Sequence, residues 1–478
     1  MLISSPPPAR TWPRAFSALA YVLMIAAAVG LFFLIRMWGE RLAPPGGADP
    51  LPASASPDAS APYVMLHLLL VLAAVIALGR ALAAVFRYVG QPPVIGEVVA
   101  GILLGPSLLG RLWPEAGAFL LPASVEPVLS AVAQLGVVLY MFVVGLELNA
   151  VMLQKRGHAA LAISHASIVI PFVLGAVLAL GLYPDMAGSN VGFTVFALFL
   201  GVAMSVTAFP VLARILSDRG LSKTALGSMA LACAAADDVT AWCLLALVVG
   251  VAKSQISSAA ITSLLTVAYI ALMYAVLRPF VARLTHHYEG RPFTPSTMAF
   301  FMVGLLASSL VTEAIGVHAI FGAFLFGAVI PHDSRAAHEL RVRIEDLVGV
   351  LLLPAFFALT GMRTQIGLVS DAHEWLICGL IIVVATAGKF GGTLLAARIT
   401  RTPWRESAAL GVLMNTRGLM GLIVLNIGLD LGVISPTLFA MMVIMALVTT
   451  MATSPALVLL LGRNETGPGA MPTPRGHA

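Results

Sequence analysis

Long apolar segments follow one another through most of this chain, and they constrain the fold more than any other feature. Each is about 20 residues long, the length that an α-helix needs to cross the hydrocarbon core of a bilayer. We count fourteen such segments: 16–35, 63–86, 92–109, 126–148, 158–182, 190–216, 222–250, 257–285, 295–313, 317–331, 344–365, 373–398, 406–430 and 435–461. The sequence therefore predicts an all-α polytopic membrane protein with about 14 transmembrane helices.

Composition supports a membrane location and excludes several classes of function. Hydrophobic residues make up 59% of the chain and charged residues 10%, against about 25% charged residues in soluble domains. The mean hydropathy is +0.98. These values exclude a soluble enzyme and a nucleic-acid-binding protein, and they make the lipid bilayer the expected partner. The three cysteines lack Cys-x-x-Cys spacing, which predicts neither a disulfide framework nor a cysteine metal site.

The chain divides into three parts. Residues 1–62 hold one apolar segment and a linker rich in Pro, Ala and Ser, residues 63–461 hold thirteen segments, and the Gly/Pro-rich tail 462–478 is expected to be disordered. The first segment has a basic start, as a cleaved signal peptide does. Its apolar run of about 20 residues exceeds the usual signal core of about 7–15 residues, so we favour a retained helix.

Positive charge gives the orientation. With the N-terminus inside and fourteen crossings, nineteen Lys and Arg residues fall in inner segments and five in outer ones. The remaining three, Arg80, Lys389 and Arg417, lie within apolar segments. Inner loops of membrane proteins carry the excess of Lys and Arg. We therefore predict a multi-pass protein of the inner (plasma) membrane with both termini in the cytoplasm.

The thirteen-segment part repeats itself. Residues 96–106 (GEVVAGILLGP) resemble residues 322–331 (GAFLFGAVIP), and residues 139–149 resemble residues 356–365. Seven helices separate the starts of the two copies, at residues 63 and 295, and an odd number inverts the second copy. Inverted repeats with broken helices are an architecture of secondary transporters.

Three ionisable residues lie deep in apolar segments. Asp237 and Asp238 are adjacent in one segment, about 100° apart on a helix, so both can face one cavity. Lys389 lies in another segment, and its expected partner is an Asp of the pair. Intramembrane ionisable residues are expensive and usually functional. The alternatives are a structural carboxylate pair and a lysine that extends to the membrane interface.

Two polar interruptions fall at corresponding positions of the repeats. In the first, Ser205, Thr207 and Pro210 interrupt a long apolar helix, since proline removes a backbone donor. The freed carbonyls and the two hydroxyls are oxygen ligands suited to an alkali cation. The matching interruption contains Asn415, Thr416 and Arg417, and the arginine can balance facing helix ends. The alternative is a proline kink with a packed polar turn.

On these residues the chain resembles the monovalent cation:proton antiporter-2 family, which includes bacterial sodium/proton antiporters and plant cation/proton exchangers. The resemblance covers about residues 63–461 and rests on six stretches: Gly96–Ser107, Met204–Leu216, Asp237–Leu247, His318–Pro331, Leu353–Thr364 and Asn415–Gly428. It implies a homodimer whose core domain moves like an elevator, with two broken helices crossing at the ion site.

The resemblance also assigns roles to single residues. Asp238 matches the family's cation-binding carboxylate, and Asp237 matches a position that is Asp in electrogenic members and Asn in electroneutral ones. Lys389 matches the lysine that pairs with Asp237's counterpart in electrogenic members. Gly421 stands where plant members commonly carry Glu, so their potassium preference does not transfer directly.

The function expected from the sequence is secondary active exchange of protons for Na⁺ or K⁺, with electrogenic transport. No enzyme activity and no cofactor are expected, because we find neither a nucleophile–base set nor metal ligands. A potassium-efflux type channel or transporter and an ion-sensing receptor on the same fold remain alternatives. No symmetric filter loop of the kind that channels use is visible.

Overall fold

The computed structural model describes residues 14–42, 63–147, 157–188, 191–221, 224–253, 256–287, 293–315 and 318–462. Within these ranges the regular elements are helices, and the single β-type pairing is an isolated bridge between Ala187 and Ile434. This confirms the predicted all-α class. The expected linker, residues 43–62, and the tail from residue 463 lie outside the described residues.

The first half of the fold ends with α11, the helix that contains Asp237 and Asp238. Its helices are α1 (Arg14–Gly39), α2 (Val64–Tyr88), α3 (Pro93–Leu104), α4 (Leu109–Leu112), α5 (Pro114–Leu120), α6 (Glu126–Glu147), α8 (Gly157–Met186), α9 (Phe193–Ser205), α10 (Phe209–Asp218) and α11 (Ala225–Lys253).

The second half begins with a helix that contains a short π-helical segment, η1. The elements are α12 (Ile256–Leu272), η1 (Met273–Leu277), α13 (Arg278–His287), α14 (Pro295–Ile315), α15 (Ala319–Val329), α16 (Arg335–Leu347), η2 (Val348–Leu352), α17 (Leu353–Arg363), η3 (Ile366–Leu368), α18 (Ala372–Ile399), α19 (Trp404–Met414), α20 (Gly418–Asp430) and α21 (Pro436–Leu461).

Nine helices of the described residues are long and apolar enough to cross a membrane by themselves. Shorter apolar helices, among them α9, α15 and most of α20, supply further apolar segments, as expected from the fourteen stretches in the sequence. One helix begins earlier than hydropathy predicts. The segment expected at 344–365 is preceded by the charged helix α16, which begins at Arg335 because the Ser334 side chain accepts a hydrogen bond from the Ala337 N–H.

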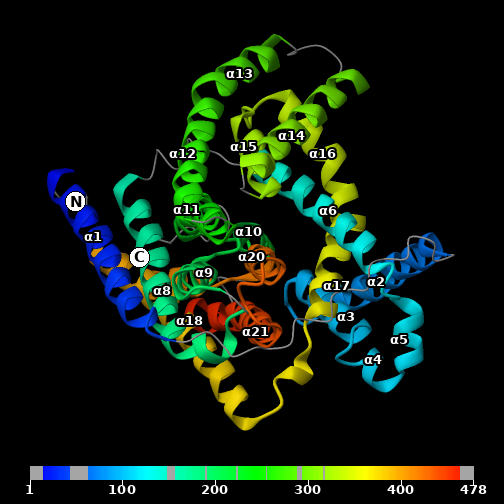
Figure 1. The fold of residues 1–478 in the computed structure, drawn as a ribbon. Helices are drawn as coiled ribbons and strands as arrows, with labels where there is room; N and C mark the ends of the chain where they lie inside the picture. The colour runs from blue at the N-terminus through cyan, green and yellow to red at the C-terminus, as the bar shows by residue number, and fades with distance from the viewer. Residues whose placement is uncertain are drawn as a thin grey trace, which may run out of the picture.

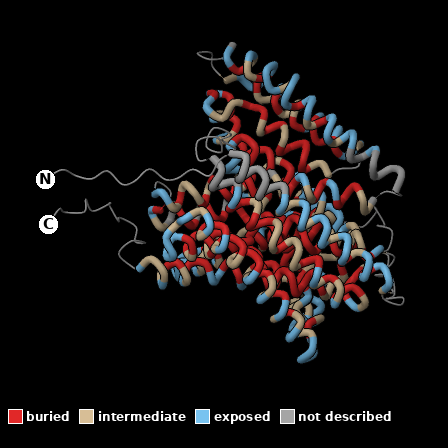
Figure 2. Tube along the Cα trace, turned by 90° about the vertical axis from the view of Figure 1, so that its left-hand side faces the viewer, coloured by how far each residue is buried: buried red, intermediate tan, exposed pale blue. Residues whose placement is uncertain are grey.

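Burial separates central helices from peripheral ones. In the most apolar stretch of α11, 71% of the residues are buried inside the protein, whereas in that of the span Leu264–His286 only 17% are buried. Figure 2 shows buried residues concentrated in the middle of the bundle and exposed residues on its outer helices. The exposed residues of α12 include Ile261, Leu264 and Val267. Apolar surface of this kind suits a lipid environment, and α11 is held away from it.

The helices form two groups (Figure 1). In the core group α8 packs on α9, α11 and α18, and α19, α20 and α21 pack together. In the scaffold group α3 packs on α2 and α17, and α15 packs on α6 and α14. Figure 1 shows α8, α9, α18 and α21 on one side of the molecule and α2, α3 and α17 on the other.

Glycine pairs hold the scaffold group together, and they follow the sequence repeat. At the crossing of α3 and α17, Gly101 and Gly361 leave no room for a side chain: a Cβ on Gly361 would lie 2.3 Å from the Val98 carbonyl oxygen. At the crossing of α6 and α15, a Cβ on Gly145 would lie 2.3 Å from the Phe324 carbonyl oxygen. Small residues allow such close approach of membrane helices.

These two crossings are equivalent contacts, each of which joins a helix of one copy of the repeat to a helix of the other. The sequence alignment pairs Gly101 with Gly327 and Gly145 with Gly361. A Cβ on Gly327 would lie 2.9 Å from Gly145 Cα, and a Cβ on Gly361 would lie 2.8 Å from Gly101 Cα. The inverted repeat predicted from sequence is therefore present in the packing.

The N-terminal helix α1 packs on the core group. It contacts α8 and α9, with the rings of Phe32 and Phe172 5.9 Å apart. Beyond its end, the Glu40 carboxylate accepts a hydrogen bond of 3.0 Å from the Thr194 hydroxyl. In the described residues its outer face carries exposed apolar side chains such as Phe33 and Trp38.

Candidate ion site

Two broken helices meet at the centre of the core group. The first break lies between the end of α9 at Ser205 and the start of α10 at Phe209, and the second between the end of α19 at Met414 and the start of α20 at Gly418. Pro210 is the second residue of α10, where a helix needs no N–H donor. Each half-helix has 10 to 13 residues, too few to cross a bilayer alone.

The breaks contact each other directly. The backbone N–H of Ala208 donates to the carbonyl of Thr416 at 2.9 Å, and the Thr207 hydroxyl donates to the carbonyl of Met414 at 3.2 Å. The first bond joins the two unwound segments, and the second joins the first break to the end of α19. These bonds bring the ends of α9 and α19 and the starts of α10 and α20 together at the crossing of the two broken helices.

Arg417 sits at the end of α9. Its guanidinium donates to the carbonyls of Ala203 (3.0 Å) and Met204 (2.7 Å) in the last turn of α9, and to that of Ala385 in α18 (3.3 Å). The residue is 1% exposed. A cation at a helix C-terminus offsets the partial negative charge there. Arg417 therefore satisfies carbonyls that the break leaves without helical partners.

Threonines of α21 cap the second break. The backbone N–H groups of Arg417 and Gly418 both donate to the Thr450 hydroxyl at 3.2 Å, and the hydroxyls of Thr416 and Thr453 are 3.3 Å apart. The start of a helix leaves N–H groups unsatisfied, and here a neighbouring helix supplies the acceptor. Sequence reasoning missed both α21 threonines.

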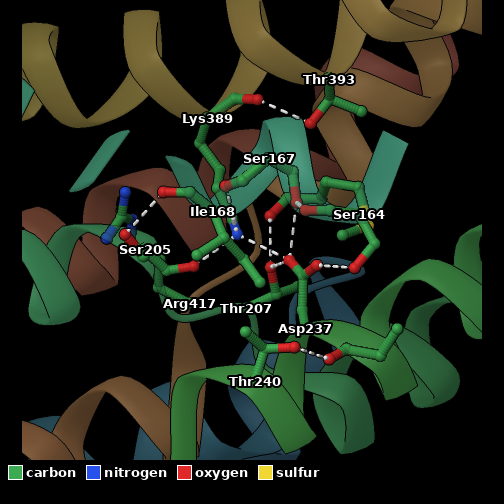
Figure 3. A network of polar contacts seen from close by, with 12 residues as sticks. Ser164, Ser167, Ile168, Ser205, Thr207, Asp237, Thr240, Lys389, Thr393 and Arg417 are labelled. Carbon is green, nitrogen blue, oxygen red and sulfur yellow. Dashed lines mark hydrogen bonds and ion pairs between the residues drawn. The ribbon is translucent and has the colours of Figure 1, made fainter. Parts of the chain in front are cut away.

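The Asp237 carboxylate is fully paired (Figure 3). Its Oδ1 accepts from the Ser164 hydroxyl at 2.6 Å. Its Oδ2 accepts from the Ser167 hydroxyl (2.7 Å), the Thr207 hydroxyl (2.9 Å) and the Lys389 ammonium (2.8 Å). Asp237 and Lys389 are both 0% exposed.

Lys389 reaches across from α18 and holds three oxygens. Besides Asp237, its ammonium donates to the backbone carbonyls of Ser167 (3.0 Å) and Ser205 (2.5 Å). The side chain therefore does not extend to the membrane interface. Its three oxygen neighbours match the three donors of an ammonium group and fix the side chain between α8, α9 and α11.

Asp238 has the opposite environment. It is 3% exposed, and among the described residues neither carboxylate oxygen accepts a hydrogen bond of ordinary geometry. The backbone N–H of Phe209, at the start of α10, makes a weak electrostatic contact with this carboxylate. A buried carboxylate in this state needs a proton or a cation.

The remaining residues expected at the site differ in their availability. The Asn415 side-chain oxygen is buried and has no hydrogen-bond partner among the described residues, so it is available as a ligand at the second break. The Ser205 hydroxyl donates to the carbonyls of Gly201 and Ile168, and the residue contacts the charged network through its own carbonyl. Ser164 and Ser167 were not anticipated. Their spacing of three residues shows that they share one face of a helix, but it does not show what they bind.

The fold and this site together are those of a secondary transporter: inverted repeats, two broken helices that cross, and buried charges at the crossing. A family described as sodium/hydrogen exchanger, transmembrane, matches residues 70–461. The chain belongs to that family. This confirms the resemblance drawn from the motifs.

Individual relatives agree with the assignment. The chain is 44% identical over 397 residues to the Na⁺/H⁺ antiporter NhaS4 of Synechocystis, covering 82% of this chain and 97% of that protein. It is 40% identical to cation/H⁺ antiporter 20 of Arabidopsis thaliana (81% of this chain, 48% of that protein). It is 35% identical to K⁺/H⁺ antiporter 1 of Saccharomyces cerevisiae (78% and 44%). The chain thus spans about half the length of the plant and yeast relatives.

A solved structure shares the fold. The sodium proton antiporter MjNhaP1 of Methanocaldococcus jannaschii superposes with a TM-score of 0.63 at 13% identity, over 84% of this chain and 98% of that one. At this identity the likeness concerns the fold alone. It confirms the predicted antiporter-type architecture.

Proposed function

We propose that the protein is a secondary active antiporter that exchanges protons for Na⁺ or K⁺ across the membrane. The observation that carries this proposal is the contrast between two adjacent buried carboxylates. Asp237 has four hydrogen-bond donors around it, whereas Asp238 accepts no hydrogen bond of ordinary geometry from the described residues. The names of the relatives, which include Na⁺/H⁺ and K⁺/H⁺ antiporters, support the same reaction.

Asp238 is the proposed binding group for both substrates. The cation would be held by its carboxylate together with oxygens of the second break, from Asn415 and Thr416. One carboxylate cannot hold a proton and a cation at once. Competition at a single group therefore couples the two fluxes, since the site crosses loaded with either one or the other.

A second proton is proposed to travel on Lys389. When a cation binds at Asp238, the lysine parts from Asp237 and releases its proton. Two protons would then exchange for about one cation, which moves net charge. The buried ion pair of 2.8 Å supports this assignment.

Movement is proposed to follow the boundary between the two helix groups. The core group carries the site, and the scaffold group is held by glycine crossings, so an elevator displacement of the core past the scaffold would expose the site to each side in turn. A homodimer joined through the scaffold, placed in the plasma membrane with cytoplasmic termini, completes the proposal.

The test is exchange by purified protein in proteoliposomes. Addition of Na⁺, K⁺ or Li⁺ should dequench a pH dye across a proton gradient, and the three ions rank the selectivity. Asp238→Asn should abolish the signal at normal yield. The matched control is Asp333→Asn, which removes a carboxylate whose side chain is 86% exposed on a loop and should exchange normally. Cation-driven proton movement retained by Asp238→Asn would overturn the role of this residue.

A further inference from the structure

Ser164 and Ser167 of α8 deliver two hydroxyls to one carboxylate, each to a different oxygen of Asp237, at 2.6 and 2.7 Å. Both serines are 0% exposed. A spacing of three residues places two side chains on one face of a helix, and Figure 3 shows both beside the Asp237 carboxylate. Hydroxyl–carboxylate bonds this short are charge-assisted.

This orientation is not the default for hydroxyls in these helices. Thr360, Thr393 and Thr450 each donate to the carbonyl four residues earlier in their own helix. Ser167 has a comparable local acceptor, the Ser164 carbonyl at 2.8 Å, yet also lies within bonding distance of Asp237. Ser164 donates to Asp237. Two hydroxyls of α8 therefore lie within bonding distance of a carboxylate on α11, and the Ser167 hydroxyl is shared between that carboxylate and its own helix.

Ser167 contacts both members of the ion pair. Its hydroxyl donates to Asp237, and its backbone carbonyl accepts from Lys389 at 3.0 Å. If the lysine leaves, Asp237 still has the hydroxyls of Ser164, Ser167 and Thr207 within bonding distance, the last two shared with backbone carbonyls. Asp238, one residue further on, has no comparable set.

We propose that Ser164 and Ser167 are positioning residues of the ion site, which hold the Asp237 carboxylate in place and charged while Lys389 is away from it. This inference rests on the proposed function and deepens it. The two carboxylates then have different roles. The serines of α8 keep Asp237 in place as a permanent anion, and Asp238 remains the group that binds the cation.

The experiment compares Ser164→Ala, Ser167→Ala and the double variant in proteoliposomes at fixed pH, over a series of cation concentrations. Each single alanine variant should lower the maximal rate about tenfold, which corresponds to the loss of one hydrogen bond to a charged group, and the double variant should lower it further. The half-saturating cation concentration should change by less than about twofold, because Asp238 is untouched. Ser164→Thr and Ser167→Thr, which keep the hydroxyl, should retain most of the rate.

Thr393→Val is the matched control. It removes a buried hydroxyl in the same region that donates only to the Lys389 carbonyl within α18, and it should leave the rate close to that of the wild type. Half-saturation does not depend on how much protein is folded, so it remains informative if a variant gives a low yield.

Three results would overturn the inference. The double variant could keep the wild-type maximal rate, its half-saturation could rise as much as its rate falls, or the threonine variants could fail as the alanine variants do. Failure of the proposed function would give different results: either the wild-type protein would not exchange cations for protons, or the Asp238→Asn variant would still do so.

Discussion

Two neighbouring aspartates acquire different chemistry from their positions on one helix. Asp237 accepts from hydroxyls of α8 and the first break and from an ammonium of α18, and Asp238, the next residue, lies about 100° further round the helix. A buried ion pair is stable only if its hydrogen bonds are complete, because desolvation offsets much of the Coulomb attraction. The pair of Asp237 and Lys389 meets this condition.

Breaking that pair should destabilise the protein more than removing it. Asp237→Asn or Lys389→Met alone should lower the free energy of unfolding by about 3–5 kcal/mol, because each leaves an uncompensated buried charge. The double variant should recover part of this loss. Thermal unfolding in detergent of the four proteins measures the coupling, and strictly additive losses would show that the two charges do not interact.

The charged residues of the site could be predicted because charges are conspicuous in apolar sequence. Asp237, Asp238, Lys389 and Arg417 all lie at the crossing or next to it, as their burial and bonds show. Ser164 and Ser167 could not be predicted, because a hydroxyl in a membrane helix usually bonds its own backbone. Only the tertiary arrangement reveals which hydroxyls also reach a side chain of another helix.

At the scale of elements, sequence predicted the helices and their repeat but not their crossings. Hydropathy reports the length of a helix and proline reports a break, so both were accessible. Which helices approach closely depends on glycines on facing sides, and a glycine in a membrane helix has no such meaning by itself. Gly101 and Gly361 close one crossing, whereas Gly379 of α18 has nothing within 4 Å of its missing Cβ.

This difference gives a paired prediction. Gly361→Ala and its repeat counterpart Gly145→Ala should each destabilise the protein by about 1–3 kcal/mol, the usual cost of overpacking, since each new methyl group meets a backbone carbonyl at 2.3 Å. Gly379→Ala is the control and should be neutral or stabilising, because alanine favours a helix. The unfolding temperature in detergent decides the matter, and equal behaviour of all three variants would contradict it.

For the whole molecule, a polar cluster joins the two helix groups at one end. Arg363 at the end of α17 forms an ion pair of 2.8 Å with Asp430 at the end of α20. One turn further in, the Asn426 amide donates to the Thr360 hydroxyl at 2.8 Å. The cluster therefore bridges scaffold and core where they would have to separate during an elevator motion.

Reversing this ion pair should alter the rate of exchange and not the affinity. Arg363→Glu places two acidic groups together and should change the initial rate several-fold, because it shifts the balance between the two positions of the core. Adding Asp430→Arg restores opposite charges and should return the rate toward that of the wild type. A double variant no better than the single one would show that the pair does not hold the groups together.

The position of α1 has a practical consequence. The helix is fastened to α8 and α9 by the Phe32–Phe172 contact and the Glu40–Thr194 bond, and its outer face is turned away from them. In the proposed motion α1 moves through the bilayer together with the core group. A fluorophore on that outward face, paired with one on the scaffold group, would report the distance between the two helix groups during each transport cycle, without any label at the ion site.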